Sequence, residues 1–252
     1  MKSFVSSHKS DVFKCQSIGD DTYLTPPYAC SYAHSSSRNV ISQLSSHQIL
    51  GSKRGGVPYL AVGTEQGTVH ILNTTKRKDW DAGKTSTLVR LVRTSSSFIE
   101  PERTTLQPHN NGIFDVKWSP DDTSIATCSG DQSTRITELN TGSVTHALRG
   151  HTSTVKCTAW DPSHKSLLAT GGRDGAICLW DLRIGKWHQS GDAGVMLASP
   201  VVTIHGSHEN TTVKSKPKVR KGKQRPATRS VTSLLYPDCD PYGLVSSGSF
   251  DG

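Results

Sequence analysis

Three side chains near the middle of the chain have the types that a hydrolytic enzyme uses: the hydroxyl of Thr170, the imidazole of His151 and the carboxylate of Asp174. In such an enzyme the imidazole takes the proton of the hydroxyl, and the carboxylate orients the imidazole. No G-x-S-x-G turn exposes a nucleophile here. His205 and His208 could form half of a metal site, but they lack cysteine or acidic partners at ligand spacing. The sequence therefore predicts neither an enzyme nor a metal or cofactor site.

The segment that carries these residues occurs twice. Residues 109–139 match residues 151–182 with offsets of 42 to 43. The paired positions are His109 with His151, Trp118 with Trp160, Thr127 with Thr170, and Asp131 with Asp174. Weaker copies lie at 60–73 and 231–252. Several short strands that repeat at a period in the low forties are typical of the blades of a β-propeller.

The expected strand at 176–180 explains why such repeats need neighbours. Its residues, Ala-Ile-Cys-Leu-Trp, are apolar on both faces, so the strand must lie between two packed layers. Asp174 and Gly175 precede it and are typical of a tight hairpin turn. A propeller meets both requirements because each of its sheets packs between two others.

The sequence therefore predicts an all-β, incomplete propeller at 25–252 after a polar tail at 1–24. Its expected blades lie near 25–73, 109–140, 151–183 and 201–252, with polar insertions at 74–108 and 184–200 and a basic loop at 209–229. A closed ring of this kind has about seven blades, and the last unit stops inside a hairpin. We therefore expect a fragment of a longer protein, which alone aggregates or partly unfolds because strand edges and one apolar face are uncovered.

The net charge of +8 comes from one segment. Eight of the 29 basic residues lie between 214 and 229, so the other 21 match the 21 acidic residues of the chain. Within this segment, five residues fit a nuclear localisation signal: Lys216, Lys218, Arg220, Lys221 and Lys223. An arm that binds DNA phosphates is an alternative, and so is a solvated insertion.

Other features of the composition exclude further classes of protein. No run of the sequence approaches the roughly 18 apolar residues of a membrane span, and the N-terminus has no secretory signal. We therefore expect no membrane partner. The six cysteines are scattered without a C-x-x-C pair, which favours a reduced intracellular compartment over a disulfide framework.

The residues His151, Thr170, Asp174 and Trp180 stand at the spacings of the WD-repeat family, which the chain resembles. In that family the four side chains form a hydrogen-bonded network across one blade. The chemistry is consistent, because a buried indole N–H needs an acceptor and an ionised aspartate needs donors. The resemblance thus implies a structural rather than a catalytic role.

The matching unit one repeat earlier departs from this pattern. It keeps His109, Thr127 and Asp131, but Thr137 and Glu138 replace the Trp-Asp pair. We therefore expect its network to lack the link that a tryptophan supplies.

The order of motifs narrows the resemblance. The segments TPPYACSY, LAVGTEQGTVHILN, HNNGIFDVKWSP and GGRDGAICLWDLR, followed by a basic insertion before SVTSLLYPD, resemble the denticleless proteins over roughly residues 25–252. Those proteins are substrate receptors of cullin-4 RING ubiquitin ligases. The resemblance implies a non-catalytic subunit that presents replication and cell-cycle proteins, displayed on PCNA at chromatin, for ubiquitination and degradation.

The resemblance also implies a docking residue. Receptors of this class bind the propeller-shaped adaptor of the ligase through a "WDxR" box, which here is Trp180, Asp181, Leu182 and Arg183. The planar fork of an arginine suits this contact because it can bond two carbonyls or a carboxylate at once. A second box, one blade earlier, would fall on residues 137–140, Thr-Glu-Leu-Asn, which lack both Trp and Arg.

A nuclear location follows from the same resemblance, with direct contact between the basic loop and nucleic acid as a minor possibility. The alternative hypothesis is a WD-repeat scaffold of another nuclear assembly, such as a chromatin or RNA-processing complex. Co-purification of the ligase adaptor distinguishes the two hypotheses.

Overall fold

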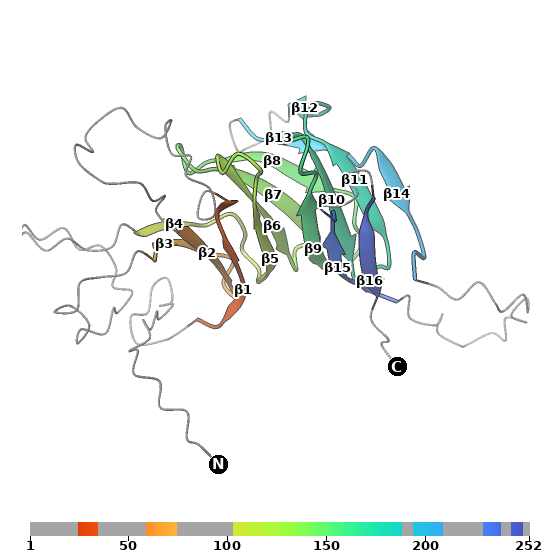
Figure 1. Ribbon diagram of the computed structural model, residues 1–252, viewed down its shortest axis with the longest axis horizontal. Coiled ribbons are helices and arrows are strands. Elements are labelled where there is room, and N and C mark those ends of the chain that lie inside the picture. Colours follow the sequence, from red (N-terminus) through yellow and green to blue (C-terminus); the bar gives the residue numbers. More distant parts are fainter. Residues whose placement is uncertain are drawn as a thin grey trace, which may run out of the picture.

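The fold is described by a computed structural model of the chain. It describes residues 25–34, 59–74, 103–187, 194–208, 229–237 and 243–248. All regular elements among these residues are strands, apart from a single 3-10 position at His34. They form four sheets that lie side by side, from the sheet of β1–β4 to that of β15–β16 (Figure 1). The prediction of an all-β, partial propeller is therefore confirmed.

The first blade is a four-stranded antiparallel sheet in the order β1-β2-β3-β4. Its strands are β1 (Pro27–Tyr32), β2 (Tyr59–Thr64), β3 (Val69–Asn73) and β4 (Arg103–Leu106). The last of these strands lies inside the span 74–108, which was expected to be a polar insertion. Its sequence, Arg-Thr-Thr-Leu, is short and polar, and it pairs with β3 at the outer edge of the sheet.

The second and third blades carry the two sharp repeats. The second contains β5 (Ile113–Trp118), β6 (Ser124–Ser129), β7 (Ser133–Glu138) and β8 (Val144–Arg149). The third contains β9 (Val155–Trp160), β10 (Leu167–Gly172), β11 (Ile177–Asp181) and β14 (Val202–Ile204). The expected boundary at residue 201 therefore needs correction, because β14 pairs with β11 and completes the third blade.

The connection between β11 and β14 adds two short strands to the preceding blade. These are β12 (Lys186–Trp187) and β13 (Met196–Ala198), both within the expected insertion 184–200. β13 pairs in parallel with β8, with Met196 opposite His146 and Ala198 opposite Leu148. The second sheet thus has six strands, in the order β12-β13-β8-β7-β6-β5.

The fourth sheet contains β15 (Val231–Leu235) and β16 (Val245–Gly248), which pair antiparallel. The first strand of each blade lies against the first strand of the next, so that β1, β5, β9 and β15 follow one another across the molecule (Figure 1). Propeller blades adopt this arrangement, in which the first strand of each blade is the inner strand, next to the central axis.

The buried core is divided among the seams between blades. One apolar cluster joins the first and second blades, another joins the second and third, and another joins the third and fourth. Strand β10 shows how one strand serves two seams: Leu168 packs toward the second blade, and Ala169 packs toward the fourth. Because successive side chains of a strand point to opposite faces, a strand shared by two seams buries apolar side chains on both of its faces.

Several expectations concern residues outside the described ranges. They include the tail at 1–24 and the proposed nuclear signal at 216–223. Within the described ranges, no helix is both long and apolar enough to cross a bilayer. The cysteines found there are free thiols, and Cys128, Cys157 and Cys178 are buried.

Candidate functional site

The four residues of the third-blade motif lie together in one hydrogen-bonded network. His151 precedes β9, and its Nδ1 lies 3.1 Å from Asp174 Oδ2. Its Nε2 lies 2.7 Å from Thr170 Oγ1 on β10. The indole N–H of Trp180, on β11, donates to the same hydroxyl oxygen at 2.8 Å. The network therefore connects the loop before the blade to three consecutive parts of the sheet.

The position of Thr170 bears on the hydrolase hypothesis. This residue is completely buried, and its hydroxyl oxygen lies between the indole of Trp180 and the imidazole of His151. A nucleophile must reach a substrate, whereas this hydroxyl is enclosed by its partners. The geometry therefore fits a brace within the sheet, with Thr170 as its central acceptor.

An ion pair strengthens the part of this network that His151 and Asp174 form. Burial alone would lower the pKa of His151, but its hydrogen bond to Asp174 and its neighbour Cys178 raise that pKa to about 9. For Asp174, burial acts to raise the pKa, yet the hydrogen bonds from His151 and from the backbone N–H of Thr152 hold it at about 2. At neutral pH the imidazolium and the carboxylate therefore form an ion pair, with side chains that are only 2% and 10% exposed.

The turn between β10 and β11 positions the carboxylate of Asp174 to accept backbone hydrogen bonds. Gly175 has a φ of +73°, a left-handed conformation that glycine adopts without steric cost. This turn lets the backbone N–H of Ala176 donate to the carboxylate of Asp174 at 3.1 Å. The carboxylate also accepts the N–H of Thr152 at 2.8 Å and so joins the turn to the loop before β9.

The second blade contains the same network without its tryptophan. His109 Nδ1 lies 2.8 Å from Asp131 Oδ2, and His109 Nε2 lies 3.0 Å from Thr127 Oγ1. The hydroxyl of Thr127 donates to the carbonyl of Arg135 at 3.2 Å. Thr137 stands where the tryptophan would be, and within the described part of the chain its buried hydroxyl has no hydrogen-bond partner. Among the four motif positions, the network of the second blade thus differs from that of the third only at Thr137, which replaces the tryptophan.

Arg183 lies at the rim, just beyond the end of β11. Its side chain is 70% exposed, while that of Asp181 is only 12% exposed. The guanidinium donates from Nη2 to Asp181 Oδ2 at 2.7 Å and from Nε to Asp181 Oδ1 at 2.9 Å. These bonds lower the pKa of Asp181 and raise that of Arg183. Asp181 therefore holds the guanidinium through Nε and Nη2, while most of the Arg183 side chain stays exposed.

The corresponding positions of the second blade carry no cation. Glu138 stands at the position of Asp181 and accepts a hydrogen bond from the hydroxyl of Thr141 at 3.1 Å. Asn140 stands at the position of Arg183 and is exposed. One blade of the pair therefore presents an arginine at this end, and the other presents an amide.

Two tryptophans that the repeat aligned prove to link adjacent blades. Trp118, at the end of β5, donates its indole N–H to the carbonyl of Ser31 in the first blade at 2.9 Å. Trp160, at the end of β9, donates to the carbonyl of Lys117 in the second blade at 3.3 Å. The shared offset of the two residues was a signal of equivalent roles, but the acceptors are backbone groups and have no sequence signature.

A partly buried carboxylate adds another link between the second and third blades. Asp115 of β5 accepts the backbone N–H of Thr158 on β9 at 2.9 Å. Burial raises the pKa of Asp115, while the nearby ammonium of Lys117, 3.8 Å away, acts in the opposite direction. Nothing in the composition of the repeat singles out this residue.

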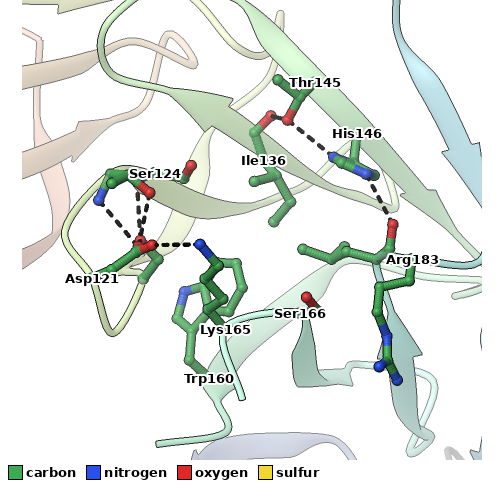
Figure 2. A pocket seen from close by; sticks show the side chains of 12 residues that line it. Asp121, Ser124, Ile136, Thr145, His146, Trp160, Lys165, Ser166 and Arg183 are labelled. Carbon is green, nitrogen blue, oxygen red and sulfur yellow. Dashed lines mark hydrogen bonds and ion pairs between the residues drawn. The ribbon is translucent and has the colours of Figure 1, made fainter. Parts of the chain in front are cut away.

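A pocket of about 250 Å³ opens at the rim beside Arg183 (Figure 2). It lies over the seam between the second and third blades. Its walls come from the β5–β6 and β9–β10 turns, from β7 and β8, and from the end of β11. No cluster of three or more His, Cys, Asp or Glu residues that could hold a metal occurs in the ranges for which the structure gives positions.

The sequence matches the family model "WD domain, G-beta repeat" at residues 100–137 and 142–181. These two matches cover most of the second and third blades, where the bracing networks lie. These two segments are thus similar to WD40 repeats. A structure of the Polycomb Repressive Complex 2 of Chaetomium thermophilum is similar to it, with 16% identity and a TM-score of 0.54 over 90% of this chain and 38% of that chain. That likeness concerns the fold alone.

The chain is also similar to the denticleless proteins. It is 28% identical to the denticleless protein homolog of Danio rerio over 243 residues, which cover 94% of this chain and 30% of the relative. It is 30% identical to the protein lethal(2)denticleless of Drosophila melanogaster over 202 residues, or 77% of this chain and 23% of the relative. The chain therefore spans less than a third of the length of these relatives.

Proposed function

We propose that this chain acts in the substrate-recognition subunit of a cullin-4 RING ubiquitin ligase and docks on the ligase adaptor through Arg183. The resemblance to denticleless proteins over most of the chain supports the class of function. The observation that carries the docking site is the fixed geometry of Arg183 beside Asp181 at an exposed rim. The role is one of presentation, with ubiquitin transfer carried out by other subunits.

The physical basis of docking is preorganisation. Asp181 is held at the end of β11, directly after Trp180, which is 2% exposed and anchored by the bracing network. The guanidinium is therefore positioned before a partner arrives, which reduces the side-chain entropy lost on binding. The exposed Arg183 side chain keeps N–H donors for carbonyl or carboxylate groups of the adaptor.

The proposal also covers the substrates that the protein presents and its location in the cell. The resemblance supports replication and cell-cycle proteins as substrates, presented on PCNA at chromatin. The basic segment at 214–229 supports import into the nucleus. Direct contact of that segment with DNA phosphates would be a minor contribution.

Binding of the purified adaptor to this chain tests the docking role. We expect Arg183→Ala to weaken binding at least tenfold. Arg173→Ala is the matched control, because Arg173 is also an exposed arginine but lies in the turn at the opposite end of β11. Equal affinities of wild type and Arg183→Ala would refute the role of Arg183. No binding by the wild type would favour the alternative, a scaffold of another nuclear chromatin or RNA-processing complex.

A further inference from the structure

Two bonds that cross the seam between the second and third blades flank the pocket beside Arg183. At one end, Lys165 Nζ donates to Asp121 Oδ2 at 3.2 Å. At the other end, His146 Nε2 lies 3.2 Å from the carbonyl oxygen of Leu182. Figure 2 shows these two links on opposite sides of the opening. Because both links join the blades, the pocket forms only where the second and third blades meet.

The inside of the pocket combines an apolar surface with available hydroxyls. Ile136, Trp160 and Leu182 contribute apolar surface. Ser124 and Ser166 also line the pocket, and neither hydroxyl has a hydrogen-bond partner in the described part of the chain. Such a cavity suits an apolar side chain whose flanking backbone groups bond to the hydroxyls.

The charged groups around the opening are already paired. The carboxylate of Asp121 accepts bonds from Ser119, Thr123 and Lys165, which hold its pKa at about 2 although burial acts to raise it. Arg183 is paired with Asp181. The interior therefore offers no unpaired charge to an ionic ligand, which leaves the apolar surface and the hydroxyls to select the occupant.

The size of the pocket also limits what it can hold. Its volume of about 250 Å³ lies below the roughly 300–1,000 Å³ typical of small-molecule sites. A single side chain of a protein partner fits this space. Protein interfaces concentrate their binding energy in such anchors, which fill a pocket near a charged or aromatic neighbour.

We propose that this pocket is the anchor site of the adaptor interface, and that it receives one apolar side chain from a loop of the adaptor. This inference rests on the proposed function, because Arg183 belongs to both the pocket lining and the docking residue set. Arg183 then orients the adaptor, and the pocket supplies the apolar contact that slows its dissociation. The second blade, which lacks the arginine, contributes one wall of the pocket instead.

Filling the pocket tests the proposal. Ser166→Trp places a large ring in it, and the side chain of Ser166 makes no hydrogen bond that would be lost. Ser163→Trp is the matched control, because Ser163 is exposed in the same β9–β10 turn but does not line the pocket. We expect the first variant to bind the purified adaptor at least tenfold more weakly than wild type, and the second to bind within twofold of it.

Ser124→Phe fills the pocket from the opposite wall and gives a second measurement should Ser166→Trp misfold. Weakened binding by either folded variant, with normal binding by Ser163→Trp, supports the proposal. Wild-type affinity in both filled variants, together with a loss in Arg183→Ala, overturns the anchor pocket and leaves the docking role of Arg183 intact. A wild-type chain that does not bind the adaptor overturns both.

Discussion

The indole N–H of Trp160 donates to the backbone carbonyl of Lys117 across the seam between the third and second blades, at 3.3 Å. Trp118 forms the same kind of link to Ser31, one blade earlier. Because both acceptors belong to inner strands, the two tryptophans tie successive blades together close to the propeller axis.

Trp160→Phe should therefore destabilise the chain by about 1–3 kcal/mol, since it removes a partly buried hydrogen bond and leaves space beside a smaller ring. Urea unfolding measures the change in the free energy of unfolding. Tyr32→Phe is the control, because Tyr32 is 56% exposed and should have little effect. Equal stability of Trp160→Phe and wild type would contradict the structural role of the link.

The bracing network predicts an unequal effect of the same substitution in two blades. Thr170→Val removes the acceptor of both Trp180 and His151 and should cost about 2–4 kcal/mol, because two buried donors lose their partner. Thr127→Val removes one partner of His109, which also lies 3.2 Å from the carbonyl oxygen of Thr127, and it removes the bond to the carbonyl of Arg135. No buried indole loses its acceptor, so the cost should be only about 1–2 kcal/mol. Chemical denaturation of the two variants checks the order, and a larger loss for Thr127→Val would reverse it.

The ion pair of His151 and Asp174 predicts how stability depends on pH. The pKa of His151 is about 9 in the folded chain, above its ordinary value of 6.5. Its contribution is therefore fully present below pH 6.5 and is lost as pH rises through 9. The pKa of Asp174 is about 2, below its ordinary value of 3.8, so its contribution is present above pH 3.8 and is lost as pH falls through 2.

Between pH 6.5 and 9 the wild type should lose about 1–3 kcal/mol of stability through this pair. Asp174→Asn should show a smaller loss over the same range, because the histidine then has no carboxylate beside it. Unfolding curves at several pH values measure both slopes. Parallel slopes for wild type and variant would argue against the ion pair.

Asp181 is expected to act as a positioning residue for the adaptor. Asp181→Asn weakens the bonds that orient Arg183, so binding should fall by about threefold to tenfold, less than for Arg183→Ala. Asp161→Asn is the control, since Asp161 also follows a tryptophan but accepts hydrogen bonds from the backbone of its own turn. Affinity that falls equally in the two aspartate variants would point to a general change in charge rather than to positioning.

The basic segment predicts where the protein accumulates in cells. Replacing residues 214–229 with a Gly/Ser linker of equal length should move a fluorescent fusion from the nucleus to the cytoplasm, if Lys216, Lys218, Arg220, Lys221 and Lys223 form the import signal. Fusing the segment to an unrelated cytoplasmic protein should produce the opposite movement. Unchanged nuclear accumulation of the replacement would leave the segment with another role.

The sharp repeat of residues 109–139 and 151–182 made the second and third blades predictable from the sequence. The outermost strands of the blades were not predicted. The spacing of His, Thr and Asp located the second and third blades because these side chains bond to one another and so must recur together. The outer strands β4 and β14 were missed for a physical reason. They are short, and they need only backbone groups to pair, so no side-chain pattern marks them.

The candidate site was predictable in part for the same reason. The sequence singled out Arg183 because it follows a distinctive Trp-Asp pair, and its docking role stays a prediction. The adjacent pocket was missed because it forms only when two blades meet. Its lining includes Ser124, Thr145 and Ser166, residue types that are common on any polar surface.

The parallel pairing of β13 with β8 has a mechanical consequence. The chain leaves the third blade, returns to lie along the second, and only then supplies β14. Tension applied beyond β14 would first peel that strand from β11 and would then have to shear β13 from β8. A pull from that side is therefore transmitted to the second blade before the rest of the third blade opens.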